Sequence, residues 1–202
     1  MKSIEHKVVS RIYGHGRGWV FSQSDFADIG SRGALDKSLQ RLASQGTIRR
    51  VIRGIYEYPA QSKQLNTTFR PDVDEVARAL ARKFRWNIQP MGMAALNILG
   101  LSTQVQGQYA YMSDGPTRRY DIDGRDLTFV HTGFRDSGFK IHESGLLVEG
   151  LKVLGPDRVT DETISKMRKA IPPNLRTAIR KDTRTAVAWV RDVIMKICEG
   201  DS

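Results

Sequence analysis

The stretch GWVFSQSDFADIGSRGALDKSLQRLASQGTIRRVIRGIYEY, residues 18–58, decides the fold of the N-terminal part of this chain. It opens with a short apolar segment, continues with two short helical patterns separated by Gly30, and ends in a β-rich segment with three arginines. A strand, two helices at a tight turn and a basic hairpin follow one another in the winged helix-turn-helix, a fold typical of DNA-binding domains.

Two helices are predicted within this stretch. Ser22 and Asp25 have the spacing of a capping box, so we expect the first helix to start there and to run to about residue 29. The second starts at Ser31 or Arg32 and stops at Gly46, a natural C-terminal residue for a helix. Its apolar residues stand at i, i+4 and i+7 and form one narrow stripe that faces a core: Leu35, Leu39 and Leu42.

The side of the second helix opposite the leucine stripe carries long hydrogen-bond donors and small residues, which suit a helix lying in the major groove. Phosphate and base contacts use the same residue types, so the pattern does not divide the two roles among them. The residues that we expect to read or clamp the groove are Arg32, Lys37, Gln40 and Arg41.

The segment TIRRVIRGIYEY, residues 47–58, is dense in β-branched and aromatic residues, and Arg53-Gly54 supplies a turn, which predicts a two-stranded wing. Arg49, Arg50 and Arg53 would lie along the wing or at its tip, where guanidinium groups suit phosphate oxygens or a narrow minor groove. A solvated basic hairpin on some other small domain is the alternative. The order of the elements favours DNA binding.

The run from Phe21 to Tyr58 resembles the N-terminal winged-helix domain of the AbiEi-type abortive-infection antitoxins of type IV toxin–antitoxin systems, including the branch with a DUF6088-type C-terminal domain. The specific part is RLASQGTIRRVIRGIY, residues 41–56, and the C-terminal half resembles the family chiefly in MGMAALNILGLSTQV, residues 91–105. The resemblance implies a transcriptional autorepressor that acts in phage defence and antagonises a nucleotidyltransferase-like toxin encoded beside it.

Composition agrees with a DNA partner. The net charge of +10 and the pI near 9.9 favour a polyanion, and the excess of positive charge lies in residues 1–58 and 150–202. Cys198 is the one cysteine, which fits a reducing cytosol. No stretch approaches the roughly 20 apolar residues of a membrane span, so a cytoplasmic protein without a membrane partner is expected.

We expect an α+β protein with a winged helix-turn-helix at residues 1–58, a linker at 59–71 and a second domain at 72–202. The second domain is predicted to open with a helix at 72–85 and a short helix that stops at Gly100. An antiparallel meander follows at about 109–131, with an edge strand at 139–141. Further helices are predicted from residue 143 or 144 to about 154, at 160–171, from 172 or 174 to 181, and at 183–198.

Two further sets of residues could carry chemistry in the second domain. A metal-dependent nuclease would use acidic and histidine side chains near residues 121–143, but Asp-Gly pairs are also what β-turns require. That set is Asp121, Asp123, Asp126, His131, His142 and Glu143. A second basic patch, typical of a solvated face or of a phosphate-binding surface, consists of Arg176, Arg180, Lys181 and Arg184.

From these patterns we expect no catalysis, no metal and no cofactor. The expected partners are double-stranded operator DNA and, by the resemblance, the toxin. A DNA-binding regulator without a toxin and the metal-dependent nuclease stay open as alternatives.

Overall fold

The computed structural model describes residues 3–62, 67–102, 107–132 and 139–199, and the fold is α+β, as predicted. The chain divides into two compact units. We call them unit 1, Met1–Trp86 with Asp121–Arg125, and unit 2, Asn87–Tyr120 with Asp126–Ser202. The division falls after Trp86 and not within residues 59–71, so the helix expected to open the second domain belongs to unit 1.

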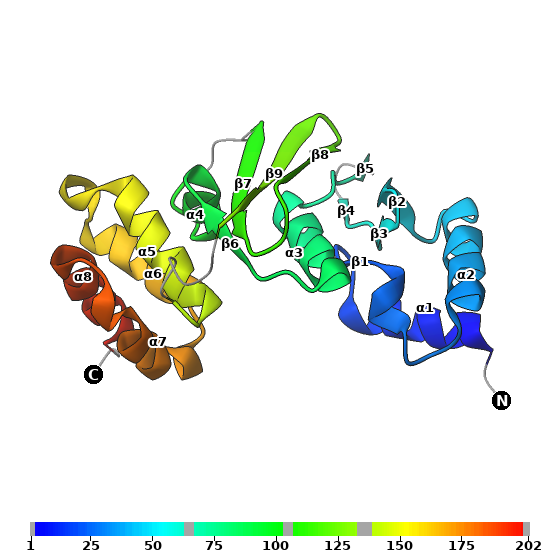
Figure 1. Ribbon diagram of the computed structural model, residues 1–202, viewed down its shortest axis with the longest axis horizontal. Helices are drawn as coiled ribbons and strands as arrows, with labels where there is room; N and C mark the ends of the chain where they lie inside the picture. The colour runs from blue at the N-terminus through cyan, green and yellow to red at the C-terminus, as the bar shows by residue number, and fades with distance from the viewer. Residues whose placement is uncertain (1–2, 63–66, 103–106, 133–138, 200–202) are drawn as a thin grey trace. The chain divides into compact units, whose positions relative to one another are not determined.

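The first 58 residues have the element order of a winged helix-turn-helix (Figure 1). The elements are α1 (Ile4–His15), β1 (Val20–Phe21), the 3-10 helix η1 (Gln23–Phe26), α2 (Arg32–Ser44), β2 (Arg49–Ile52) and β3 (Ile55–Glu57). β2 and β3 form an antiparallel hairpin, and β3 lies between β1 and β2 in the sheet. The predicted wing is therefore present as the β2–β3 hairpin, directly after α2.

The core of unit 1 forms where α1, η1 and α2 turn apolar side chains toward one another. Phe21 and Phe26 meet edge to face, with ring centroids 5.4 Å apart. Each large apolar side chain stabilises the fold by roughly 1.5–3 kcal/mol when it is fully buried. The leucine stripe of α2 is confirmed as a buried face, and the buried core residues are Val8, Ile12, Phe21, Phe26, Leu35, Leu39, Leu42 and Ile48.

Helix α1 ends at His15 and is capped by Gly16, whose φ of 85° is a conformation that glycine adopts easily. One helix of unit 1 is shorter than predicted. The helix expected at residues 22–29 is the single 3-10 turn η1. The Asp25 carboxylate accepts a hydrogen bond of 2.8 Å from the backbone N–H of Ser22, which stabilises that first turn only.

Helix α3 (Val73–Phe84) also belongs to unit 1 and packs against β1, η1 and β3. Asp72 caps it by accepting backbone hydrogen bonds from its first turn, as the sequence predicts. Near its other end, Arg82 donates to Asp25 at 2.9 Å and to the carbonyl of Val20 at 2.7 Å. Between wing and helix, where a linker was expected, the short strands β4 (Gln61–Ser62) and β5 (Thr67–Thr68) pair antiparallel.

The second sheet, which lies mainly in unit 2, is mixed and lacks the order of the predicted meander. Its strands β6 (Ile88–Met91), β7 (Gln108–Ser113), β8 (Arg118–Ile122) and β9 (Arg125–His131) have the order β6-β7-β9-β8. β6 and β7 are antiparallel, but β7 and β9 are parallel neighbours. Leu127 and Phe129 are buried, which is consistent with an inner position for β9. Arg118 and Arg119 are exposed, which is consistent with β8 at an edge of the sheet.

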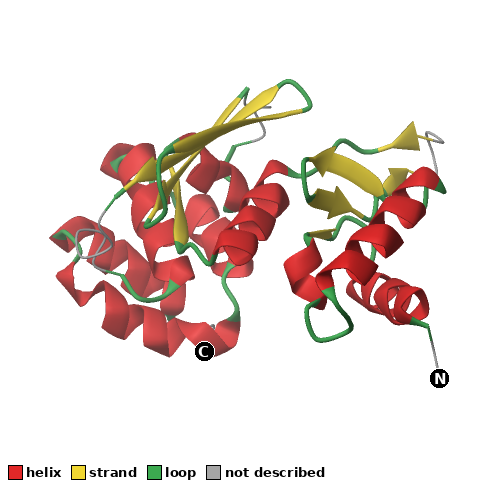
Figure 2. Cartoon of the chain, turned by 45° about the vertical axis from the view of Figure 1, so that its right-hand side comes forward, coloured by secondary structure: helices red, strands yellow, loops and turns green. Residues whose placement is uncertain are grey.

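Helices form the C-terminal part of unit 2 (Figure 2). The helices of the unit are α4 (Met93–Ile98), α5 (His142–Leu154), α6 (Asp161–Ala170), α7 (Arg176–Asp182) and α8 (Ala188–Cys198), with 3-10 turns at Pro156–Arg158, Pro173–Leu175 and Thr183–Thr185. These helices confirm the sequence prediction within a few residues. Residues 139–141, expected as an edge strand, form no strand.

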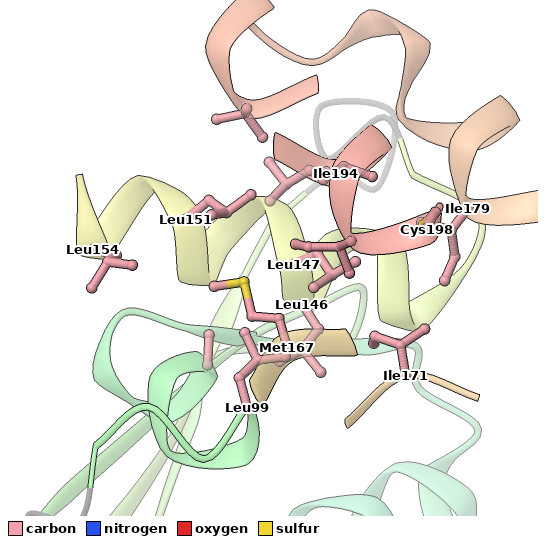
Figure 3. Close-up of a cluster of buried hydrophobic side chains, with 14 of the residues drawn as sticks. Leu99, Leu146, Leu147, Leu151, Leu154, Met167, Ile171, Ile179, Ile194 and Cys198 are labelled. Atoms are coloured by element: carbon pink, nitrogen blue, oxygen red, sulfur yellow. The ribbon is translucent and has the colours of Figure 1, made fainter. Parts of the chain in front are cut away.

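The core of unit 2 is built from α4 to α8 (Figure 3). Leu147 and Leu151 on α5 are fully buried, and side chains of the later helices pack against the same cluster. Gly150 lets α5 approach α4 closely, because a Cβ at that position would lie 2.5 Å from Cδ1 of Leu99. Within the described ranges, none of the helices combines the length and the apolar character needed to cross a bilayer.

Candidate nucleic-acid interface

The polar face predicted for α2 is exposed to solvent along its whole length. Arg32, Lys37 and Gln40 are exposed, whereas Leu35 and Leu39 are fully buried on the opposite side. Arg41 is also exposed, and its Nη1 lies 2.9 Å from a carboxylate oxygen of Glu5 on α1. Such exposed ion pairs contribute about 0–1 kcal/mol, so this guanidinium can exchange Glu5 for a phosphate at little cost.

The wing separates its two adjacent arginines onto opposite faces. Arg49 stands opposite Glu57 in the strand register, and Arg50 stands opposite Tyr56. Because successive side chains of a strand alternate between faces, only one of the two can share the exposed face. Arg50 is exposed, and so is Arg53 at the turn. The structure thus leaves Arg50 and Arg53 available for a polyanion.

Arg49, expected to contact phosphate, is bound within the protein instead. Its Nε donates to Oε2 of Glu57 at 2.9 Å, its Nη2 donates to the same oxygen, and Nη2 also donates to the carbonyl of Phe69 at 2.8 Å. Glu57 is only 2% exposed. Burial raises the pKa of Glu57, and the hydrogen bond from Arg49 opposes that rise. Arg49 therefore neutralises the charge of a buried carboxylate. It also connects the wing to Phe69, the residue that follows β5.

Lys83, which the sequence did not single out, reaches the tip of the wing from α3. Its Nζ lies 3.4 Å from the carbonyl oxygen of Arg53 and 3.5 Å from that of Gly54. Burial lowers the pKa of Lys83, and the nearby charges of Arg53 and Arg32 lower it further. The first residue of α2, the wing tip and α3 therefore contribute to one basic region. No local pattern reveals this, because 30 positions separate Lys83 from Arg53 in the sequence.

The predicted second basic patch is only partly a surface feature. Arg180, Lys181 and Arg184 are exposed around the end of α7. Arg176 is half-buried and donates to the carbonyl of Arg168 at 3.2 Å. Three of the four residues therefore form a basic surface on unit 2, and the fourth connects α6 and α7.

The three aspartates considered for a nuclease have structural partners. Asp121 accepts a hydrogen bond of 3.1 Å from the N–H of Gly124, Asp123 lies 3.2 Å from Arg70, and Asp126 pairs with Arg119. The pairing with Arg119 lowers the pKa of Asp126. These contacts are those of a β-turn and of surface ion pairs.

The two histidines of that set do not complete a metal site in the described chain. His131 Nδ1 lies 2.9 Å from the carbonyl oxygen of Gly115, and His142 begins α5 together with Glu143. The glycine-containing segment 133–138 between the histidines lies outside the described residues. Among the residues that are described, no group of three or more His, Cys, Asp or Glu side chains could hold a metal ion.

Comparison with known proteins identifies a family whose function is unknown. A family model matches residues 7–179, and its description reads "Family of unknown function (DUF6088)". No curated protein matches the chain. The match begins in unit 1 and continues into unit 2, so it is not confined to the winged helix-turn-helix.

Proposed function

We propose a function for this chain, which belongs to the DUF6088 family of unknown function, from the chemistry of its own side chains. The protein binds double-stranded operator DNA and represses transcription there. The observation that carries the proposal is the exposed polar face of α2 next to a wing with exposed arginines. α2 would lie in the major groove, with Gln40 placed to read a base edge. Arg50 and Arg53 would hold the phosphate backbone or enter the minor groove.

We propose in addition that the protein is the cytoplasmic antitoxin of a nucleotidyltransferase-like toxin and represses the operon that encodes both. What supports this is the resemblance of residues 21–58 to the AbiEi-type antitoxins. In this proposal unit 1 carries repression, unit 2 antagonises the toxin, and the protein catalyses no reaction. A nucleotidyltransferase gene beside this one favours the proposal, and a neighbourhood without such a gene favours a stand-alone regulator.

DNA binding is tested by titrating the full chain onto the DNA upstream of its own gene and onto a scrambled duplex. Between about 50 and 200 mM salt, log K should fall linearly with log salt concentration, by about 0.9 per neutralised phosphate. The double variant Arg50→Gln with Arg53→Gln should bind both duplexes more weakly and with a smaller salt slope. Gln40→Ala should mainly reduce the preference for the operator.

A matched control for these variants is Lys166→Gln, which removes an exposed charge from α6 of unit 2. It should leave both the affinity and the salt slope unchanged. Equal binding by the wild type and the double wing variant would contradict the proposed interface. A wild type that binds neither duplex would contradict the proposed function itself.

A further inference from the structure

Lys83 occupies a defined position at the turn of the wing. Its ammonium group approaches two successive carbonyl oxygens, those of Arg53 at 3.4 Å and Gly54 at 3.5 Å. Gly54 permits this approach, because a Cβ there would lie 2.7 Å from Nζ of Lys83. The φ of +75° at Gly54 also favours glycine at the turn. The lysine and the tight turn are therefore complementary in shape.

The position of Lys83 is set by the packing of α3. Val76, Ala77 and Leu80 are buried on one face of the helix, and α3 contacts β1, η1 and β3. Arg82, the preceding residue, is held by Asp25 and by the carbonyl of Val20. With its neighbour fixed in this way, Lys83 projects from the last turn of α3 toward the wing tip.

Three cations lie near one another at the turn of the wing. Among the residues that the structure describes, none of Arg32, Arg53 and Lys83 pairs with a carboxylate. Arg32 and Arg53 are near enough to Lys83 to lower its pKa. Like charges repel, so the arrangement gains stability from an anion that lies among them. An ammonium group has three donors, and the two carbonyl contacts leave one for such an anion.

We infer that Lys83, Arg53 and Arg32 together bind one phosphodiester group of the DNA backbone, so that α3 is part of the DNA-binding surface. The inference rests on the proposed function for the identity of the ligand. The two guanidinium groups supply bidentate donors, and Lys83 supplies a compact charge between the wing tip and α3. The DNA-binding unit then extends to Trp86 and includes a helix beyond the winged helix-turn-helix.

The test compares charge removal at two positions near the same end of α3 in the full chain. Lys83→Gln should reduce the salt slope of log K by up to about 0.9 and weaken operator binding by up to about fivefold at 0.15 M salt, because the phosphate is less completely neutralised and less counterion is released. Arg85→Gln, the matched control, should leave the slope unchanged. Lys83→Arg should restore it. A slope in Lys83→Gln equal to that of the wild type would limit Lys83 to holding the turn and would overturn the inference.

A second measurement separates this inference from the proposed function. Inorganic phosphate is titrated into the full chain while the backbone amide resonances of Gly33 and Gly54 are followed by NMR. Saturable shifts in the wild type that are lost in Lys83→Gln and kept in Arg85→Gln would establish the anion site even if no duplex binds. If no duplex binds and phosphate produces no shifts, both the function and the site are refuted.

Discussion

Arg49 and Arg50 are adjacent in β2, but their guanidinium groups have different surroundings. Arg49 turns inward to a carboxylate that is almost completely buried, and Arg50 is exposed on the other face. A buried ion pair is costly to break, because the remaining charge has neither water nor a partner. A loss of DNA binding in an Arg49 variant therefore has to be separated from a loss of stability.

Arg49→Gln should destabilise unit 1 by up to about 3 kcal/mol at neutral pH, the lower end of the cost of breaking a buried pair, because Arg49 is itself partly exposed. Burial already raises the pKa of Glu57 above its ordinary value of 4.5. A carboxyl with a raised folded-state pKa loses stability as pH rises from the unfolded pKa through the folded one. The deficit of Arg49→Gln should therefore grow as pH increases above 4.5, as measured by urea unfolding.

The control for this pH dependence is the double variant Arg49→Gln with Glu57→Gln, which has no carboxyl group to titrate at position 57. Its deficit relative to the wild type should vary less with pH over the same range. A deficit in the single variant that shrinks as pH rises would show that the Glu57 carboxylate is not desolvated as described.

Leu39 and Gln40 provide a second comparison between adjacent residues. Leu39→Ala removes a fully buried side chain from the core of unit 1 and should cost about 2–5 kcal/mol of unfolding free energy. Gln40→Ala changes an exposed residue and should stay within about 0.5 kcal/mol of the wild type. Chemical denaturation followed by circular dichroism measures both, and equal stability in the two variants would mean that α2 is rotated from its described orientation.

At the scale of elements, sequence patterns that span a few residues correctly predicted the helices and turns that depend on those residues alone. The leucine spacing of α2, the Asp72 cap of α3 and the Arg53-Gly54 turn each lie within a few residues, and each element is present. Strand order was not predictable in this way. The parallel pairing of β7 with β9 depends on how segments that are distant in the sequence pack together, and β6 was missed because Pro90 reads as a break, although an edge strand tolerates it.

The candidate site follows the same division between local and tertiary information. The exposed face of α2 follows from helical periodicity, so its residues could be named from the sequence. The partner of Arg49 depends on strand register, and the position of Lys83 depends on how α3 packs. Neither is encoded in a short stretch of sequence, and both change which cations are available to DNA.

The packing of α3 predicts which fragment will be stable. A fragment of residues 1–86 keeps α3 and the contacts of Arg82 with Asp25 and Val20, whereas a fragment ending near Ser62 loses them. The longer fragment should have the higher thermal midpoint and the higher DNA affinity. Circular dichroism melts and duplex titrations of both fragments check this, and equal midpoints would mean that α3 adds nothing to the winged helix-turn-helix.

At the scale of the whole molecule, each unit has its own core, so their activities should be separable by core substitutions. Leu147→Ala removes a fully buried side chain of unit 2 and should cost that unit about 2–5 kcal/mol. If unit 2 antagonises the toxin, this variant should lose growth rescue in co-expression with the neighbouring toxin and should still bind operator DNA. Leu39→Ala should show the reverse pattern when the genes are expressed from a foreign promoter.

Rescue by residues 1–86 alone, or full rescue by a chain whose unit 2 is unfolded, would show that neutralisation depends on unit 1. The assignment of antitoxin activity to unit 2 would then be withdrawn. Expression from the foreign promoter serves as the control, because it removes the contribution of repression at the native operator.

The burial of Cys198 makes the reactivity of its thiol a measure of how often unit 2 opens. It is the one cysteine of the chain, it lies in the core of unit 2, and burial raises the pKa of its thiol. A thiol reagent attacks the thiolate, so modification should await an opening that brings Cys198 into water. The labelling rate of the wild-type protein thus reports the openings of unit 2 that expose Cys198. When the protein is bound to operator DNA, the labelling rate should be unaltered if the two units fluctuate independently. The rate should fall if DNA binding also reduces the opening of unit 2.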